Sequence, residues 1–456
     1  MNFILVPLHT GTLQTSSYSD NTIFYVYAAF FNVLLTYGME TAFFRYFSKS
    51  KEQGKVYSTV LISLVATTII FLALVLAFIT QLSNWFGLQP VYFNLLIGVL
   101  VLDTLVVAPF AYLRATGKPI RFTAIKLSNI AIYVGLNFFF LWAIPKFSFE
   151  FQWYQENDLV QYIFIANLCA SVATLLLLLP YFLKFKWQFD KTIFKQLINY
   201  GWPIMVAGLA YVINENFDKW LIPDLLGRDI NGAYSGCYKI AVFMTIFIQA
   251  FRLGAEPFFF NYSKESNARE TYATIMKFFV IFGSFIFLLI LAYLDFFKEL
   301  LVKDESYWMA MDIVPIVLLA NLCLGIYFNL AIWYKLTDKT RFGMYISLIG
   351  AVITIGLNYT LIPEHGFIAA AWTTLAAYGS MMLISYLLGQ KYYKVPYEIS
   401  RIGLYLVMAV GLGIIILLKE DQNYLLNTGI LLLFLLTAII IEKQTIKGLL
   451  NSKYDH

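Results

Sequence analysis

The chain has 456 residues, of which 60% are hydrophobic and only 13% are charged, and its mean hydropathy is +0.71. A soluble domain carries about 25% charged residues, so this composition excludes a water-soluble fold and requires the bilayer as solvent. The net charge of +5 does not indicate a nucleic-acid ligand, because the basic residues fall in short connections between apolar stretches.

The apolar stretches are long enough to cross a membrane. A spanning helix needs about 20 mostly apolar residues. A window of that length predicts an all-α polytopic membrane protein with spans at 21–47, 56–80, 91–113, 122–144, 159–183, 197–222, 231–260, 272–294, 308–334, 342–361, 367–390, 402–418 and 424–441.

The first residues add part of a further helix to this plan. Met1–Leu8 is apolar but too short for a cleavable signal peptide, and it resembles the last turns of a helix. We therefore expect a fourteen-helix plan with a truncated first helix, followed by an outer connection at Thr10–Asp20. The three cysteines, Cys169, Cys237 and Cys323, lie in apolar stretches without CxxC spacing, which indicates small buried side chains rather than disulfides or metal ligands.

The distribution of Lys and Arg predicts the orientation of the spans. With the connection at Thr10–Asp20 outside, 22 of the 32 basic residues lie on the inner side, five lie outside and five lie within spans. The outer five are Lys146, Arg228, Lys298, Lys303 and Lys419. The prediction is a multi-pass protein of the inner (plasma) membrane with a cytoplasmic C-terminus.

Two parts of the chain repeat each other at a nearly constant offset. At 216 residues the matching pairs are Tyr18 with Tyr234, Ser19 with Ser235, Gly38 with Gly254, Glu40 with Glu256, Phe43 with Phe259, Phe44 with Phe260, and Tyr46 with Tyr262. Near 221 residues, the run Arg114-x-Thr116-x-Lys118 recurs as Lys335-x-Thr337-x-Lys339, and Gly135-Leu136-Asn137 recurs as Gly356-Leu357-Asn358.

The offset covers six helices, an even number, so the two halves enter the membrane in the same direction. The sequence predicts an N-terminal helical lobe at 1–190, a C-terminal lobe at 191–395, and an additional helix pair with a cytoplasmic tail at 396–456. Parallel repeats of this kind are typical of transporters in which one half rocks against the other. The pattern therefore indicates transport by alternating access.

Several segments resemble bacterial polysaccharide flippases. The run Asn231–Ala241 is similar to the entry of their eighth helix, and Tyr37–Tyr46 is similar to the end of their second. Asn214–Lys219 resembles a polar spot in their seventh helix, and Leu113–Lys118 resembles the cytoplasmic end of their fourth. The resemblance extends over nearly the whole chain and implies the multidrug/oligosaccharidyl-lipid/polysaccharide exporter (MOP) superfamily.

The resemblance further implies a function. Within this superfamily it points to a monomeric flippase that moves undecaprenyl-diphosphate-linked oligosaccharide across the inner membrane for O-antigen (lipopolysaccharide), capsule or exopolysaccharide biosynthesis. H⁺ or Na⁺ is the candidate coupling ion, and no cofactor is expected. A cation-coupled multidrug exporter of the same superfamily is the alternative, and a membrane polysaccharide polymerase or glycosyltransferase is the alternative from another class.

Basic residues within the spans are the candidates for substrate binding. A charge inside the bilayer is costly and usually faces a cavity or a partner. A lipid diphosphate crossing the membrane needs Lys or Arg donors, and Arg is favoured for its bidentate geometry. The candidates are Arg252, Lys239 and Lys126. The alternative for each is pairing with a carboxylate or reaching the membrane surface.

Other intramembrane charges are candidates for a gate or an ion-coupling site. Arg252 precedes Glu256 by four residues, which places them on one helix face and equally suggests a local ion pair. Glu215 precedes Lys219 by four residues in the same way, so a compact polar cluster is expected there. The cluster with Asp218 is either a structural pair that holds the two halves together or a gate or ion-coupling site. The full set is Asp218, Lys219, Glu215, Glu40, Glu256 and Asp103.

Signals for an enzyme are weak. The three histidines, His9, His365 and His456, are predicted on two outer loops and at the last residue, without a second metal ligand at useful spacing. The sequence has no GxxxxGK[ST] run for a nucleotide. The longest predicted outer loops, Lys146–Asp158 and Asp295–Tyr307, are too short for the active site expected of a polymerase. A transporter is therefore expected rather than an enzyme.

Overall fold

A computed structural model gives the structure of the chain and describes residues 3–418, 423–445 and 447. Within those residues, thirteen helices are long and apolar enough to cross a membrane, and most of their ends lie within a few residues of the predicted spans. The prediction of an all-α polytopic fold is confirmed. Met1, Lys419 and His456 lie outside the described residues.

The helices pack into two compact units. The first unit contains Met1–Gly236 and Thr354–Phe367, and the second contains Cys237–Ile353 and Ile368–His456. The division falls inside two helices, α12 (Arg228–Tyr238) and α18 (Arg341–His365). The lobe boundaries expected from the sequence, after residues 190 and 395, stay a prediction.

The first unit consists of the helices up to the start of α12 and the end of α18. Before α12 they are α1 (Val6–Thr12), α2 (Thr15–Thr36), α3 (Met39–Phe47), α4 (Gln53–Ala77), α5 (Ile79–Phe86), α6 (Pro90–Leu105), α7 (Val107–Ala115), α8 (Pro119–Phe138), the π-helical turn η1 (Phe139–Ala143), α9 (Ile144–Phe147), α10 (Val160–Phe182) and α11 (Lys191–Leu226).

The second unit consists of the rest of the chain. Its elements are the 3₁₀ turn η2 (Lys239–Ala241), α13 (Val242–Tyr262), α14 (Ala268–Ala292), α15 (Leu294–Leu301), the 3₁₀ turn η3 (Glu305–Ala310), α16 (Ile313–Leu330), α17 (Ile332–Leu336), the start of α18, α19 (Phe367–Tyr392), α20 (Ile399–Leu417) and α21 (Tyr424–Ile441).

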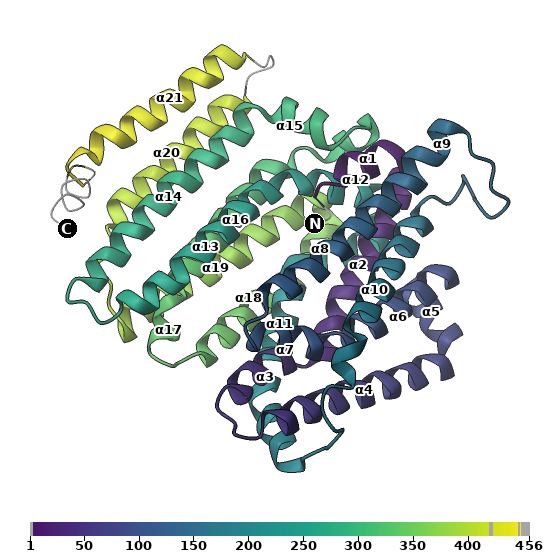
Figure 1. The fold of residues 1–456 in the computed structure, drawn as a ribbon. Coiled ribbons are helices and arrows are strands. Elements are labelled where there is room, and N and C mark those ends of the chain that lie inside the picture. Colours follow the sequence, from purple (N-terminus) through teal and green to yellow (C-terminus); the bar gives the residue numbers. More distant parts are fainter. Residues whose placement is uncertain (1–2, 419–422, 446, 448–456) are drawn as a thin grey trace. The chain divides into compact units, whose positions relative to one another are not determined.

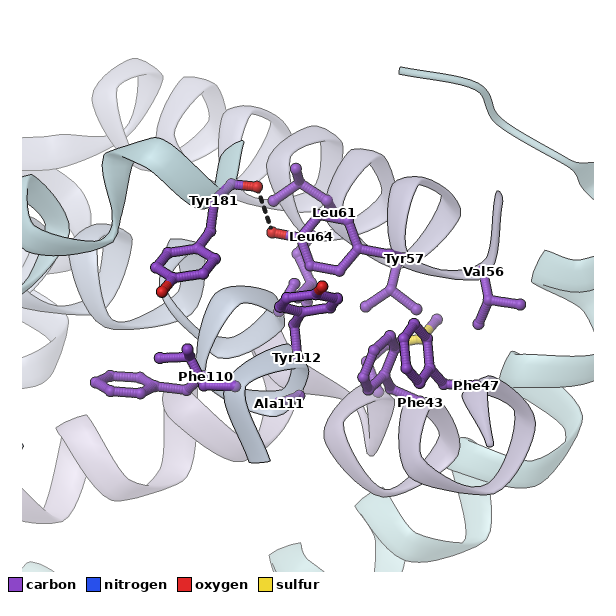
Figure 2. Close-up of a cluster of buried hydrophobic side chains, with 14 of the residues drawn as sticks. Phe43, Phe47, Val56, Tyr57, Leu61, Leu64, Phe110, Ala111, Tyr112 and Tyr181 are labelled. Carbon is purple, nitrogen blue, oxygen red and sulfur yellow. Dashed lines mark hydrogen bonds between the residues drawn. The ribbon is translucent and has the colours of Figure 1, made fainter. Parts of the chain in front are cut away.

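The first unit has an aromatic core at one end. Helices α3, α4 and α7 bring Phe43, Phe47, Tyr57 and Tyr112 together, and Figure 2 shows their rings in contact. The rings of Phe43 and Phe47 lie 4.6 Å apart, and those of Tyr57 and Tyr112 lie 5.2 Å apart. The Tyr57 hydroxyl donates a hydrogen bond of 2.8 Å to the backbone carbonyl of Tyr181, so the one polar group of that ring is satisfied.

The second unit is built around α14 and α16. The span Ile313–Leu336 is 78% buried over its most apolar window, whereas Ile399–Leu417 is only 22% buried. The C-terminal pair α20–α21 therefore lies at the edge of this unit, where Figure 1 shows α20 running beside α14. A buried charge network holds the pair there, because Lys277 of α14 contacts Glu442 and Glu398 at 2.7 Å each.

The outer connection expected at Thr10–Asp20 is much shorter than predicted, and its location on the outer side stays a prediction. Helix α1 continues to Thr12, and α2 already begins at Thr15. The polar side chains at the start of α2 are buried against polar partners, so a hydropathy window could not recognise them as helical. His9, which was predicted on this outer loop, lies in α1 instead. Its side chain is 3% exposed, and its Nε2 lies 2.9 Å from Asn137 Oδ1.

Two short amphipathic helices follow spans that end in the same way. Phe78 (φ −124°, ψ 26°) ends α4 before α5, and Tyr293 (φ −120°, ψ 32°) ends α14 before α15. Segment Asp295–Tyr307, expected as a loop, is thus largely helical. A short amphipathic helix suits the membrane interface, where one face meets acyl chains and the other meets headgroups.

Candidate functional site

The charges on α13 form one of the ionic sites of the second unit. Arg252 and Glu256 lie four residues apart on one face of this helix, and Arg252 Nη2 is 3.3 Å from Glu256 Oε1. Lys335, from α17, donates to the same carboxylate oxygen at 2.6 Å. Arg252, Glu256 and Lys335 are named the cation cluster below; two cations share one carboxylate, so its net charge is +1.

The cation cluster is partly exposed and lies beside a cavity of about 10 Å³. The side chains of Arg252, Glu256 and Lys335 are 31%, 36% and 26% exposed, and all three line a small cavity. The Arg252 guanidinium lies 4.2 Å from the centre of the Phe328 ring, which fixes its plane. A guanidinium held by a ring on one side and a carboxylate on the other can still offer N–H groups to an anion.

A larger apolar groove adjoins the cluster. It lies between α13 and α14, has a volume of about 430 Å³, and is lined mainly by phenylalanine rings. Phe251 lines both this groove and the cavity of the cation cluster. The second unit therefore offers apolar and cationic surfaces next to each other.

The first unit contains the repeat counterpart of the cluster. Arg114 Nη1 is 2.6 Å from Glu40 Oε1, and these residues are the equivalents of Lys335 and Glu256. The position equivalent to Arg252 is Thr36. The duplication therefore preserves one ion pair in both halves, and the additional arginine belongs to the second alone.

The turns that carry these basic residues have the same backbone geometry in both halves. Lys118 N donates to Leu113 O at 3.0 Å, and Lys339 N donates to Tyr334 O at 2.8 Å. The left-handed residue of each turn is equivalent too, with φ +64° at Gly117 and +56° at Asp338. These two turns of the predicted repeat thus share one backbone conformation.

The structure places the other two substrate-binding candidates elsewhere. Lys239 is the first residue of η2 in the second unit, and its side chain is half-buried. Lys126 lies on α8 in the first unit, where it is exposed and its ammonium sits 4.3 Å from the centre of the Phe110 ring. Neither belongs to the cation cluster.

The expected polar cluster on α11 is a buried ion pair. Lys219 Nζ lies 3.1 Å from Asp218 Oδ1, and the side chains are 7% and 4% exposed. Glu215 contributes its backbone carbonyl, which accepts a hydrogen bond of 2.8 Å from Lys219 Nζ. Sequence reasoning missed Tyr234, whose hydroxyl donates to Asp218 Oδ2 at 2.5 Å, although the repeat motif already contained this tyrosine.

Asp103 lies in a polar region inside the first unit. The Ser171 hydroxyl, from α10, donates to Asp103 Oδ1 at 2.8 Å. Nearby, the Tyr25 and Tyr133 hydroxyls are 2.9 Å apart, and Asn167 Nδ2 donates to Tyr25 at 3.3 Å. A half-buried carboxyl among hydroxyl and amide groups can exchange a proton or accept a small cation.

A family model matches the whole first half of the chain and continues beyond it. The model of the polysaccharide biosynthesis protein family matches residues 1–255. The chain belongs to this family. A second model, MatE, matches residues 203–360.

Solved structures of other proteins have the same fold. The lipid II flippase MurJ in an inward closed conformation has a TM-score of 0.71 at 14% identity and covers 98% of this chain and 97% of its own. An inward-facing multidrug resistance MATE family transporter of the MOP superfamily scores 0.68 at 13% identity, covering 88% and 94%. A MOP superfamily transporter from Pyrococcus furiosus scores 0.58 at 13% identity, covering 88% and 92%. No curated protein matches the chain.

The family assignment confirms the expectations at the level of the superfamily. The chain is a multi-pass membrane transporter of the MOP superfamily rather than an enzyme. In its described residues, no group of three or more His, Cys, Asp and Glu side chains could hold a metal ion.

Sequence reasoning missed two further ionic sites. Lys277 falls within a predicted span and was not recognised as a buried partner, although Glu442 directly follows the last span. Asp20 was assigned to a loop, but it pairs with Arg228 at the start of α12. For Lys277, the available signal was a charge inside an apolar run. The sequence around Asp20 gave no indication that this residue is buried and paired.

Proposed function

We propose that the protein is a flippase for undecaprenyl-diphosphate-linked oligosaccharide, acting by alternating access in the inner membrane to supply surface polysaccharide biosynthesis. The cation cluster carries this proposal. Arg252 and Lys335 bind the diphosphate, and Lys239 and Lys126 are separate candidates for binding it. Membership of the polysaccharide biosynthesis protein family supports a glycan-linked substrate.

The chemistry of the cluster suits a substrate that must be bound and then released. An arginine can donate two parallel hydrogen bonds to two phosphate oxygens. A charge-assisted hydrogen bond of this kind contributes about 1.5–3 kcal/mol. Glu256 competes for the same two cations, as its contacts of 3.3 and 2.6 Å indicate. The carboxylate therefore limits the affinity, so that the headgroup can leave on the far side.

The neighbouring groove suits the lipid part of such a substrate. A water-soluble sugar would gain nothing from the phenylalanine rings between α13 and α14, whereas an isoprenoid chain would remain in an apolar environment there. The headgroup alone then needs polar contacts during translocation.

Substitution of Arg252 tests the proposal. Arg252→Ala should abolish surface polysaccharide assembly at unchanged protein level, and the purified variant should bind undecaprenyl diphosphate at least about tenfold more weakly. Arg341→Ala, which removes an exposed arginine at the start of α18, serves as the control and should leave both unchanged. Normal polysaccharide in the Arg252→Ala strain would remove this residue from the site.

A second candidate function, cation-coupled export of drugs, is favoured by the MatE match and by the polar surroundings of Asp103. In that reading Asp103 carries the coupling ion, and Asp103→Asn should remove the dependence of transport on an imposed H⁺ or Na⁺ gradient. Proteoliposomes containing the wild-type protein should then export ethidium and show no binding of undecaprenyl diphosphate. The opposite pattern favours the flippase.

A further inference from the structure

The connection between α9 and α10 is rich in exposed aromatic rings. Phe147, Phe149, Phe151 and Trp153 occupy every second position, and Trp142 precedes them in the π-helical turn η1. The exposed fraction of these five side chains lies between 38% and 57%. They are named the aromatic strip below, and Figure 1 shows the connection that carries most of them projecting away from the helices beside it.

The rings of the strip contact one another in chain order. The ring centres of Phe147 and Phe149 lie 5.8 Å apart, and those of Phe149 and Phe151 lie 6.2 Å apart. Trp142 extends the series at one end, 6.0 Å from Phe147, and Trp153 extends it at the other, 5.0 Å from Phe151. The strip is therefore one continuous aromatic surface.

The end of the strip at Trp153 is fixed by hydrogen bonds. The Tyr162 hydroxyl donates to the backbone carbonyl of Trp153 at 3.1 Å and accepts from the backbone N–H of Gln155 at 2.6 Å. The Tyr154 hydroxyl donates to the backbone carbonyl of Phe140 at 2.8 Å, and the Tyr154 and Tyr162 rings stack at 4.9 Å. A surface held in this way loses little conformational entropy when a ligand binds.

Polar side chains are interleaved with the rings. Carboxylate and amide oxygens accept hydrogen bonds from hydroxyl groups, and amide nitrogens donate them. The connection therefore offers aromatic surface and hydrogen-bonding groups within a few residues of each other. The exposed polar side chains belong to Ser148, Glu150, Gln152, Gln155, Glu156 and Asn157.

This combination suits a sugar. The face of a pyranose ring that carries C–H groups is apolar and packs on aromatic rings, whereas the hydroxyl groups at its edge need hydrogen-bond partners. Aromatic rings in series can hold successive sugars of one oligosaccharide. The match to the polysaccharide biosynthesis protein family, over residues 1–255, includes the whole strip.

A lipid bilayer is the competing partner, because aromatic side chains gather at membrane interfaces. The charge of the connection argues against it. Lys146–Asp158 contains one lysine and three acidic residues, a net charge of −2. Segments that bind a membrane surface are typically rich in Lys and Arg instead. The same negative charge repels a diphosphate, so the sugar is the part of the substrate that fits here.

We propose that the aromatic strip binds the oligosaccharide of the substrate by packing against the faces of its sugar rings. The inference rests on the proposed flippase function and on the predicted outer location of the connection. In that function Arg252 and Lys335 bind the diphosphate, which all such substrates share. The strip contacts the sugars, which differ between substrates, and therefore contributes specificity.

Comparing the substrate with and without its sugar tests the strip. Detergent-solubilised wild-type protein should bind the undecaprenyl-diphosphate-linked oligosaccharide extracted from its own strain at least about tenfold more tightly than undecaprenyl diphosphate alone. The variant Phe149→Ala/Phe151→Ala/Trp153→Ala should lose this preference and keep its affinity for undecaprenyl diphosphate. Phe296→Ala removes a similarly exposed ring from α15 and is the matched control, which should keep the preference. A triple variant that keeps the preference would overturn the proposal.

A fluorescent probe on the strip separates a sugar from a bilayer. Phe147→Cys, in a Cys169→Ser background, carries bimane at one end of the strip and leaves the other rings in place. In liposomes, oligosaccharide released from its lipid by mild acid should reduce quenching of this probe by aqueous iodide severalfold. Strong quenching by spin-labelled phospholipid, without protection by the oligosaccharide, would instead place the strip in the bilayer and contradict the proposal.

Failure of the strip and failure of the flippase function give different results. If the protein binds undecaprenyl diphosphate equally well with and without the sugar, the strip is wrong and the flippase function stands. If the protein binds neither lipid but the released oligosaccharide still protects the probe from iodide, the flippase function is wrong and the strip stands as a sugar site.

Discussion

Single buried charges determine which helices stay together in this protein. Lys277 is 1% exposed in the middle of an apolar helix, and it is tolerated because Glu442 and Glu398 both lie 2.7 Å from its ammonium group. Burial alone would raise the pKa of Glu442, but hydrogen bonds from Lys277, Thr445 and Tyr405 hold this pKa below its ordinary value. The carboxylate therefore stabilises the fold at neutral pH and loses that contribution only as the pH falls through the lowered pKa.

Removal of Lys277 should destabilise the second unit. Lys277→Met leaves Glu442 buried with fewer partners, which we expect to cost about 3 kcal/mol. The measurement is thermal unfolding of the purified protein in detergent. The double variant Lys277→Met/Glu442→Leu should regain most of the loss, because a buried ion pair can be replaced by apolar side chains at little cost. A double variant less stable than the single would argue against the pairing.

Equivalent helices of the two halves have different backbone conformations at one shared glycine position. The difference shows how a helix adapts to its neighbours. Helix α2 ends at Tyr37 (φ +32°) and Gly38 (φ +73°), whereas α13 runs unbroken through the equivalent Gly254. A Cβ at Gly38 would lie 2.4 Å from the backbone oxygen of Gly201, so α11 approaches the break closely. The break is therefore set by packing in the first unit and not by the repeated motif.

Alanine at the two glycines should have opposite effects. Gly38→Ala adds a side chain to a left-handed residue and forces α11 away, and it should lower the free energy of unfolding by at least about 2 kcal/mol. Gly254→Ala should be neutral or stabilising by about 0.5–1 kcal/mol, because alanine is the better helix former. Melting temperatures in the same detergent compare them. Equal losses in both variants would contradict the assignment of the break to packing at Gly38.

At the scale of the whole molecule, the excess of basic residues on one set of connections predicts the orientation of the protein in the membrane. Ser266 lies in the hairpin between α13 and α14 on the basic side, and Glu305 lies in η3 on the opposite side. Both side chains are exposed. They report the two faces of the membrane without touching the proposed site.

Cysteine labelling should confirm this orientation. In a Cys169→Ser background, which removes the exposed native thiol, Glu305→Cys should react with an impermeant maleimide in spheroplasts. Ser266→Cys should react only after the membrane is permeabilised, because the positive-inside rule places its hairpin in the cytoplasm. The reverse pattern would invert the predicted topology.

Much of the candidate site could be predicted, though not its partners. The spacing of Arg252 and Glu256 indicated a shared helix face, and the structure pairs them. The repeat aligned Glu40 with Glu256, but nothing in the sequence showed that each meets a basic residue at the end of another helix. Glu215 was expected in a polar cluster with Asp218 and Lys219, and its backbone carbonyl accepts a hydrogen bond from Lys219 Nζ. Side-chain direction depends on neighbours that spacing alone does not reveal.

The sequence by itself determined the number of spans and the duplication, because hydropathy and internal repetition are properties of windows of about 20 residues and of fixed offsets. Only the tertiary structure decided which polar residues meet. Asp20 finds Arg228 at a separation of 208 residues, and Lys277 finds Glu398 at 121. In a bilayer a buried charge needs a partner. Which distant side chain becomes that partner is determined by how the helices pack.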